Sequence, residues 1–367
     1  MINPLKTLHD HDQSFWVDYI DRDLVSRGGI ERLVEEDGLR GLTSNPSIFE
    51  AAISGSDDYD TDIRNEIASG TGDDTKRVFE ALAVKDIRAA ADALGDIYRS
   101  SDRRDGFVSF EVSPHLARDT QGTLDEAKRL WTLVDRPNLM IKVPATAEGM
   151  PAIEELIASD ININVTLIFS VSDHYENAAQ AFIRGVERSA DPSHVASVAS
   201  FFVSRVDTAV DIELERIGTP EALGIRGKAA IANAKLAYAQ FQKLFRSGRF
   251  ERQRERGARP QRVLWGSTST KNPDYRDVLY VEDLIGPETV NTIPPKTVDA
   301  FRDHGNVRTM LTAGVPEAET LLGHLGELGI DVDRVTAKLQ DDGVAAFAAS
   351  FDQLLEALAT KIEALLD

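Results

Sequence analysis

Eight short runs of β-branched and aromatic residues recur along this chain, and helix-like segments lie between most of them. Strands that alternate with helices are typical of right-handed βαβ units sharing one parallel sheet. Eight such units predict an α/β fold, a closed (β/α)₈ barrel of the TIM type. An open doubly wound sheet is the alternative, but no G-x-G-x-x-G follows any run, so its dinucleotide fingerprint is missing. The predicted strands are Phe15–Ile20, Leu39–Thr43, Phe107–Val112, Leu139–Val143, Ile161–Phe169, Val195–Val203, Arg262–Ser267 and Thr289–Ile293.

The longer segments between these runs are predicted to be helical insertions. Ser172–Arg188 and Gly227–Phe245 carry apolar residues at helical spacing. Residues 46–106 are long enough for several helices, and residues 206–261 for at least two more. Within the second of these, Arg246–Gln261 is Arg-rich and lacks apolar periodicity, so we expect an exposed loop there.

The C-terminal tail, residues 296–367, is also predicted to be helical. An apolar stripe runs through residues 344–366, and we expect it to pack on the exterior of the barrel. The chain shows no repeat of fixed period, no low-complexity linker and no convincing boundary. Residues 1–367 are therefore predicted to form a single barrel domain, with its strands within about 15–295 and its helical tail over about 296–367.

Composition narrows the classes of function. The net charge of −20 argues against a nucleic-acid partner, because polyanions need clustered Lys and Arg, although a local basic pocket can still bind a small phosphate. The chain has no cysteine, and its seven histidines lack metal-ligand spacing, so thiol chemistry and a metal site are not expected. The first residues contain no apolar signal region, and no stretch is apolar enough to span a bilayer. We expect a cytoplasmic protein with no membrane attachment.

Several predicted strands carry polar residues on one face only. Side chains alternate between the two faces of a strand, and barrel strands are usually apolar on both. Alternation alone is also typical of a half-solvated strand, and a buried Glu is often half of a structural ion pair. A Lys inside an apolar strand is rarer, since lysine is almost never buried unpaired. Together these residues predict an active site at the C-terminal mouth of the barrel. They are Asp18, Ser109, Glu111, Lys142, Asn162, Asn164 and Thr166.

A buried lysine with carboxylates nearby indicates Schiff-base formation with a carbonyl substrate. The amine of Lys142 must be neutral to attack, and burial favours the uncharged form. Nearby carboxylates oppose that effect, so one of them should be protonated or placed to move protons. The protonated imine then accepts the electrons of a breaking carbon–carbon bond.

Four motifs resemble those of the transaldolases. Asn138–Thr146, which reads NLMIKVPAT, resembles the Schiff-base lysine strand of that family. Leu42–Ser47 resembles its T-x-N-P-S turn, Ser109–Val112 its glutamate strand and Ile163–Ser170 its N-x-T-L strand. The matches follow the family order from Asp18 to about Lys271, and the insertions and long tail resemble the larger bacterial branch.

The resemblance implies a class I enzyme that needs no metal and no other cofactor. Such an enzyme moves a dihydroxyacetone unit from sedoheptulose 7-phosphate to glyceraldehyde 3-phosphate in the non-oxidative pentose phosphate pathway. Lys142 would form the imine, and Asp18 would exchange the proton of the hydroxyl beside the cleaved bond. Glu111, with a water held by Thr166, would serve imine formation. The hydroxyls of the dihydroxyacetone unit would be held by Asn45, Asn164 and Ser200.

The resemblance is looser at the phosphate end. Arg205 keeps the family's spacing from Ser200, and Ser267 resembles a phosphate-binding serine. The next basic residue, Lys271, requires a short insertion, and a solvated loop lysine is the alternative reading. Phe202 corresponds to Phe in transaldolases and to Tyr in their aldolase relatives, although packing also accounts for it, as it does for Trp16.

Three other functions are compatible with a lysine barrel. A fructose 6-phosphate aldolase-like enzyme would form the same imine but release dihydroxyacetone. A deoxyribose phosphate type of aldolase would need a second strand lysine, which is not evident. A catalytically inactive scaffold barrel is disfavoured by the complete set of Lys142, Glu111 and Asp18. The expected partners are sugar phosphates, and we expect a monomer or a homodimer.

Overall fold

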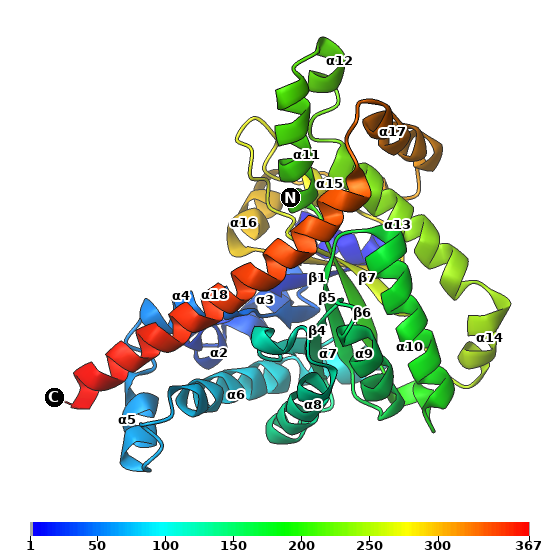
Figure 1. The fold of residues 1–367 in the computed structure, drawn as a ribbon. Helices are drawn as coiled ribbons and strands as arrows, with labels where there is room; N and C mark the ends of the chain where they lie inside the picture. The colour runs from blue at the N-terminus through cyan, green and yellow to red at the C-terminus, as the bar shows by residue number, and fades with distance from the viewer. Residues whose placement is uncertain (1–2, 367) are drawn as a thin grey trace.

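Eight parallel strands close into one barrel in the computed structural model, which describes residues 3–366 (Figure 1). The strands follow chain order around the barrel, and the last pairs with the first. Each overlaps one of the eight predicted runs, and its two ends differ from the predicted ones by at most two residues each. The predicted (β/α)₈ barrel is therefore confirmed. The strands are β1 (Gln13–Asp18), β2 (Gly41–Thr43), β3 (Phe107–Glu111), β4 (Leu139–Pro144), β5 (Ile163–Ile168), β6 (Ser197–Phe202), β7 (Arg262–Gly266) and β8 (Thr289–Ile293).

Helices fill the segments between the strands, as the apolar spacing predicted. Residues 46–106 hold α4 to α7, and the segment predicted as Ser172–Arg188 starts with a π-helical turn, η3, before α10. The helices are α1 (Pro4–Thr7), α2 (Arg22–Ser26), α3 (Gly29–Asp37), α4 (Pro46–Ser54), α5 (Asp60–Ala68), α6 (Thr75–Ala93), α7 (Gly95–Ser100), α8 (Thr120–Val134), α9 (Gly149–Ala158), α10 (Asn177–Arg188), α11 (Ser204–Ile217), α12 (Pro220–Leu223), α13 (Ala229–Phe245), α14 (Gly248–Glu255), α15 (Leu279–Asp283), α16 (Pro295–His304), α17 (Val315–Glu327) and α18 (Val332–Leu366). Short turns of other helix types are η1 (Leu8–His11), η2 (Pro114–Leu116), η3 (Val171–Glu176) and η4 (Pro192–His194).

Large side chains fill the lower half of the barrel interior. Trp16 is fully buried there, and a Cβ atom at Gly41 would lie only 2.4 Å from its ring. Glycine at that position therefore makes room for the indole. The packing role considered for Trp16 is confirmed. The same cluster contains Phe107, Met140, Val198, Leu264 and Val290.

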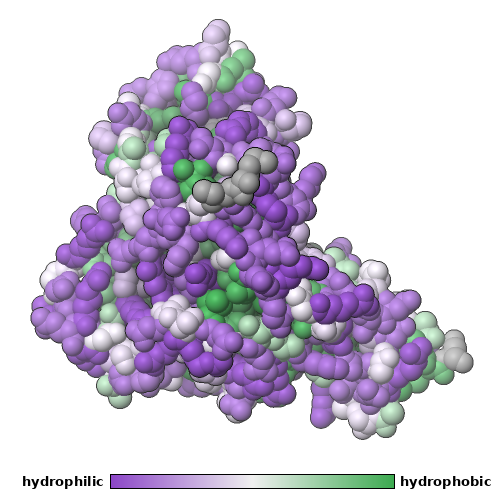
Figure 2. Space-filling model, turned by 180° about the vertical axis from the view of Figure 1, so that it is seen from behind, coloured by the Kyte–Doolittle hydropathy of each residue, from purple (hydrophilic) through white to green (hydrophobic). Residues whose placement is uncertain are grey.

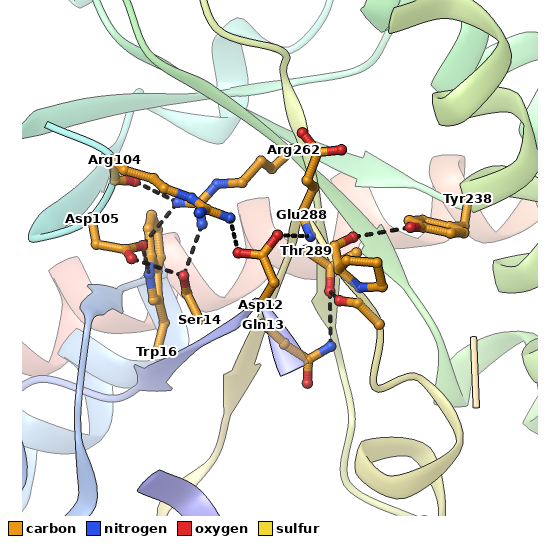
Figure 3. Close-up of polar contacts among 12 residues, drawn as sticks. Asp12, Gln13, Ser14, Trp16, Arg104, Asp105, Tyr238, Arg262, Glu288 and Thr289 are labelled. Carbon is orange, nitrogen blue, oxygen red and sulfur yellow. Dashed lines mark hydrogen bonds and ion pairs between the residues drawn. The ribbon is translucent and has the colours of Figure 1, made fainter. Parts of the chain in front are cut away.

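A polar network closes the floor of the barrel (Figure 3). Arg262, at the start of β7, donates hydrogen bonds to the Ser14 hydroxyl at 2.8 Å and to Asp105 Oδ1 at 2.9 Å. It also donates to the carbonyl oxygen of Arg104 at 2.6 Å. Asp105 accepts a further bond from Ser14 at 2.9 Å. Seen from behind Figure 1, the molecule is mostly hydrophilic, with its largest hydrophobic patch near the centre of the view and smaller ones elsewhere (Figure 2).

The prediction of an exposed loop over Arg246–Gln261 was wrong, because this segment contains α14. Phe250 is fully buried, with its ring 4.8 Å from Phe245 and 6.4 Å from Phe182 between centroids. One aromatic residue therefore anchors a short, otherwise hydrophilic helix. Such a helix gives no apolar periodicity, which is why the sequence pattern did not reveal it.

The tail is helical as predicted, but its place was predicted wrongly. In place of packing on the barrel exterior, the 35-residue α18 crosses the front of the barrel as drawn in Figure 1. It contacts α4, α6, α11 and β5, and its apolar stripe, including Phe351 and Leu358, is buried by those contacts. A helix of this length extends about 50 Å, enough to cross the whole mouth. Among residues 3–366, no helix is both long and apolar enough to cross a membrane.

Candidate active site

Three neighbouring strands bring the central residues into one row. The register pairs Glu111 of β3 with Lys142 of β4, and Lys142 with Asn164 of β5. Lys142 is buried, and its Nζ lies 3.3 Å from Oε2 of Glu111. Nζ also donates a hydrogen bond to the carbonyl oxygen of Ser44 at 3.1 Å. The predicted placement of Lys142 inside the barrel is confirmed.

Glu111 is buried with unsatisfied hydrogen-bonding capacity. Among the residues that the structure describes, neither of its carboxylate oxygens has a hydrogen-bond partner, and neither does the hydroxyl of Thr166. Burial raises the pKa of Glu111, the charge of Lys142 opposes that rise, and the nearby charge of Asp18 adds to it. A carboxyl group whose pKa is raised towards neutrality can both accept and donate a proton. Glu111 has the properties of a general acid–base group.

Asp18 ends β1 at the mouth. Its Oδ1 accepts a hydrogen bond from the Thr43 hydroxyl at 2.6 Å, and that hydroxyl lies 2.6 Å from the hydroxyl of Thr292. Burial raises the pKa of Asp18, while the charge of Lys142 is the largest effect that lowers it. A second carboxyl group with a raised pKa therefore stands near the same lysine.

Amides and hydroxyls occupy the neighbouring positions. Asn164 is fully buried; its Nδ2 donates to the Ser109 hydroxyl at 2.9 Å, and its Oδ1 accepts from Ser200 at 2.6 Å. Asn45 is the N-cap of α4, where its Oδ1 accepts from the backbone N–H of Ile48 at 3.1 Å. These bonds fix the orientation of both amides. Asn45 lines the cavity and can face a polyhydroxylated ligand directly, whereas Asn164 reaches the cavity through its bond to Ser200.

Two cations stand at the far side of the mouth. Arg205 lies in the first turn of α11, with its guanidinium 5.6 Å from the centre of the Phe202 ring. Lys271 donates to the Ser269 hydroxyl at 2.9 Å. Burial lowers the pKa of Arg205, and burial together with the charge of Arg205 lowers the pKa of Lys271. The two cations repel each other, so an anion bound between them would relieve the repulsion.

Ser267 is held in an unusual backbone conformation beside these cations. Its φ is +54°, in the left-handed region, directly after the end of β7. Its hydroxyl lies 2.9 Å from that of Ser204 at the start of α11. A non-glycine residue in this region costs about 1 kcal/mol or more and is frequent at ligand-binding sites.

One cavity of about 150 Å³ connects these groups. Glu111, Asn164 and Thr166 do not line it and lie in the barrel wall beside Lys142. Larger cavities exist elsewhere, including one of about 630 Å³ between η3, α13, α17 and α18, but the buried lysine and the Asp18 carboxylate belong to the smaller one. Glu111 lines a separate cavity of about 20 Å³. The predicted residues that line the cavity are Asp18, Asn45, Lys142, Ser200, Phe202, Arg205, Ser267 and Lys271.

The sequence did not reveal every residue of the cavity. Thr43 and Thr292 line it and lie on strand faces that alternation would have identified. Phe347 also lines it. It belongs to the apolar stripe predicted in the tail, but no sequence signal placed that stripe beside Lys142. Conversely, Asn162 faces inward as predicted but bonds backbone groups only, donating to the carbonyl oxygens of Pro137 and Leu139, each at 2.9 Å. Over residues 3–366, no group of three or more His, Asp or Glu is arranged to hold a metal.

Known proteins resemble the chain along most of its length. A model of the family described as Transaldolase/Fructose-6-phosphate aldolase matches residues 15–358. A protein of Thiobacillus denitrificans named Transaldolase is 49% identical over 361 residues, which is 96% of this chain and 99% of the relative. Transaldolase of Mycolicibacterium smegmatis is 45% identical over 96% of this chain and 95% of the relative. Transaldolase 2 of Nostoc punctiforme is 43% identical over 99% of this chain and 98% of the relative.

Proposed function

The chain belongs to the transaldolase/fructose-6-phosphate aldolase family, and we propose that it carries out its transfer through a Schiff base on Lys142. Its relatives support transaldolase activity, which makes it a transferase. The donor we propose is sedoheptulose 7-phosphate and the acceptor glyceraldehyde 3-phosphate, with erythrose 4-phosphate and fructose 6-phosphate as products. This is a step of the non-oxidative pentose phosphate pathway. The observation that carries the proposal is the buried Lys142, whose Nζ lies 3.3 Å from the buried carboxyl group of Glu111, a group without a hydrogen-bond partner among residues 3–366.

Imine formation is assigned to Lys142 and Glu111. Nζ attacks the ketose carbonyl carbon, and the resulting carbinolamine must lose water. Glu111, 3.3 Å from Nζ, supplies and removes the protons of this step. The water that relays them is assigned to Thr166, whose buried hydroxyl has no hydrogen-bond partner among residues 3–366.

Bond cleavage is assigned to Asp18. It takes the proton of the hydroxyl beside the carbon–carbon bond, the bond breaks, and its electrons pass into the protonated imine. The aldehyde leaves while the three-carbon unit stays on Lys142. A new aldehyde then enters, the new bond forms, and Asp18 returns the proton. The hydroxyls of the bound unit are assigned to Asn45, Asn164 and Ser200. Asn45 and Ser200 line the cavity, and Asn164 acts through its hydrogen bond to Ser200.

The phosphate group is assigned to Arg205, Ser267 and Lys271. The protein as a whole carries a net charge of −20, so local donors must supply the attraction for an anionic substrate. The two cations and the strained serine stand together at one side of the cavity. We also infer a cytoplasmic location. We further infer that the protein is a monomer or a homodimer, and light scattering of the purified protein would test this oligomeric state.

Borohydride trapping tests the covalent step. Incubation with fructose 6-phosphate and borohydride should attach the three-carbon unit or the whole sugar to Lys142, and Lys142→Ala should lose both adduct and activity. Lys85→Ala is the matched control, since Lys85 is an exposed lysine that pairs with Asp62. An adduct that maps to another lysine would refute the assignment.

The family name also covers aldolases that release dihydroxyacetone, and Phe202 favours transfer over release. Phe202 lines the cavity and has no proton to donate to the bound three-carbon unit. We expect little dihydroxyacetone from fructose 6-phosphate alone and rapid transfer once erythrose 4-phosphate is added. Phe202→Tyr should raise release relative to transfer. Fast release by the unmodified enzyme without an acceptor would make it an aldolase.

A further inference from the structure

α18 holds one aromatic side chain over the mouth of the barrel. Towards its N-terminal end, Gln340 donates from Nε2 to the carbonyl oxygens of Ala145 at 2.8 Å and Leu167 at 3.1 Å, beside β4 and β5. Towards its C-terminal end, Lys361 bonds a carbonyl oxygen of α4 at 3.3 Å. Phe347 lies between these two attachments. Its position is therefore fixed by hydrogen bonds on both sides.

Phe347 is the apolar neighbour of the proposed imine nitrogen. The Nζ of Lys142 lies 5.6 Å from the centre of the Phe347 ring, within the range of about 6 Å for a cation–π contact. The ring lines the cavity and is only 6% exposed. Lys142 thus has two unlike neighbours, the Glu111 carboxyl group at 3.3 Å and a phenyl ring.

The Glu111 carboxyl group can bind a water molecule beside Lys142, whereas the Phe347 ring cannot. Release of the three-carbon unit requires a proton on its carbanion carbon, then attack of water on the imine carbon. The carbon–nitrogen bond breaks, the amine of Lys142 is regenerated, and dihydroxyacetone leaves. A phenyl ring neither donates a proton nor binds a water through a hydroxyl, and its face stabilises an adjacent cation. A ring over the nitrogen therefore retards both steps of release, protonation of the carbanion and attack of water on the imine, while the bound three-carbon unit awaits an aldehyde.

We propose that Phe347 is a positioning residue of the active site, placed by α18 to exclude water from the imine and so favour transfer over release. This inference rests on the proposed Schiff base at Lys142. It also gives α18 a role in the reaction, since the helix carries Phe347 to the lysine from a distant part of the chain. The effect acts on the lifetime of the bound intermediate and does not require contact with the phosphate site.

The test measures a ratio of rates for one enzyme preparation. The first rate is dihydroxyacetone release from fructose 6-phosphate alone, and the second is transfer to erythrose 4-phosphate. Phe347→Leu removes the aromatic face, and Phe347→Ala also opens space for water. We expect the ratio of release to transfer to rise about tenfold in Phe347→Leu and further in Phe347→Ala.

Leu358→Ala is the matched control, because Leu358 is a fully buried residue of the same helix that does not line the cavity. It should reduce stability and leave the ratio unchanged. Equal ratios in all three variants and the unmodified enzyme would overturn the role of Phe347. Borohydride trapping at Lys142 is run alongside, so a missing adduct in the unmodified enzyme identifies a failure of the proposed function instead.

Discussion

The barrel carries one buried ion pair at its floor and another at its mouth. At the floor, Arg262 lies 2.9 Å from Asp105, and Ser14 bonds both partners (Figure 3). At the mouth, Lys142 lies 3.3 Å from Glu111, and neither Glu111 oxygen has a hydrogen-bond partner among residues 3–366. All four of these charged residues are buried.

The pKa values of Asp105 and Glu111 are shifted in opposite directions, because the two carboxyl groups differ in the hydrogen bonds that they accept. Burial alone would raise the pKa of Asp105, but the charge and hydrogen bond of Arg262, with the bond from Ser14, lower it below its ordinary value. Burial raises the pKa of Glu111, and Lys142 does not fully offset this effect. A fully hydrogen-bonded buried pair holds its protons in place, whereas an incompletely bonded pair can exchange them. We therefore propose that the floor pair is structural and the mouth pair reactive.

The largest expected effect is on activity at the mouth. Lys142→Met should reduce transfer by about 10⁴-fold or more, because the covalent step is lost. Stability, measured by urea unfolding, should change by no more than about 1 kcal/mol, since Glu111 can take up a proton once its cation is removed. A stability loss as large as that at the floor would contradict the distinction between the two pairs.

The next effect is on stability at the floor. Arg262→Met should lower the free energy of unfolding by about 3–5 kcal/mol, because it leaves Asp105 buried without its cation. The folded fraction should still form the borohydride adduct at Lys142. Arg259→Met is the control: Arg259 pairs with Asp102, which is 83% exposed in its side chain, so it should cost no more than about 1 kcal/mol.

Neutralising each carboxyl group should have opposite effects on stability. The lowered pKa of Asp105 means that its contribution is present above its ordinary pKa of about 3.9 and is lost as pH falls through the folded value. The raised pKa of Glu111 means that its contribution is present below about 4.3 and is lost as pH rises through the folded value. At pH 7, Asp105→Asn should therefore destabilise the fold and Glu111→Gln should stabilise it.

The same two variants, Glu111→Gln and Asp105→Asn, should also differ in activity. Glu111→Gln should slow adduct formation by about 10²–10⁴-fold, the usual contribution of a general acid–base group. Asp105→Asn should leave the rate per folded molecule unchanged. Unfolding curves at pH 4 and pH 7, with adduct yields at pH 7, separate the outcomes. A destabilised Glu111→Gln would show that this residue is structural after all.

The smallest expected effect concerns substrate binding at the mouth. Arg205→Ala should raise KM for phosphorylated substrates by roughly 10- to 150-fold, because a charge-assisted hydrogen bond contributes about 1.5–3 kcal/mol. Lys271→Ala should raise it less, since lysine binds phosphate as a point charge without the fork of arginine. Steady-state kinetics with fructose 6-phosphate measure both. An unchanged KM and kcat in Arg205→Ala would remove it from the site.

Local patterns in the sequence were enough to place the barrel and the central row of the site. The strand runs, their alternation with helices and the parity of Glu111, Lys142 and Asn164 are properties of neighbouring residues, and a strand's two-residue period makes them readable. The same parity placed Asn162 inside, yet it did not reveal that Asn162 bonds only backbone groups. The position of a residue in a strand predicts the face to which its side chain points, but it does not predict the hydrogen-bond partners of that side chain.

Only the tertiary structure decided which buried pair is fully hydrogen-bonded and which side chains surround each pair. Arg262 and Lys142 both lie in apolar strands, and the hydrogen bonds that distinguish them come from residues far away in the chain, such as Ser14 for Arg262. Phe250 and Phe347 are similar cases, each a single aromatic whose neighbours are set by the path of a helix. Contacts between distant segments depend on how those segments pack, and packing leaves no periodic signal in the sequence.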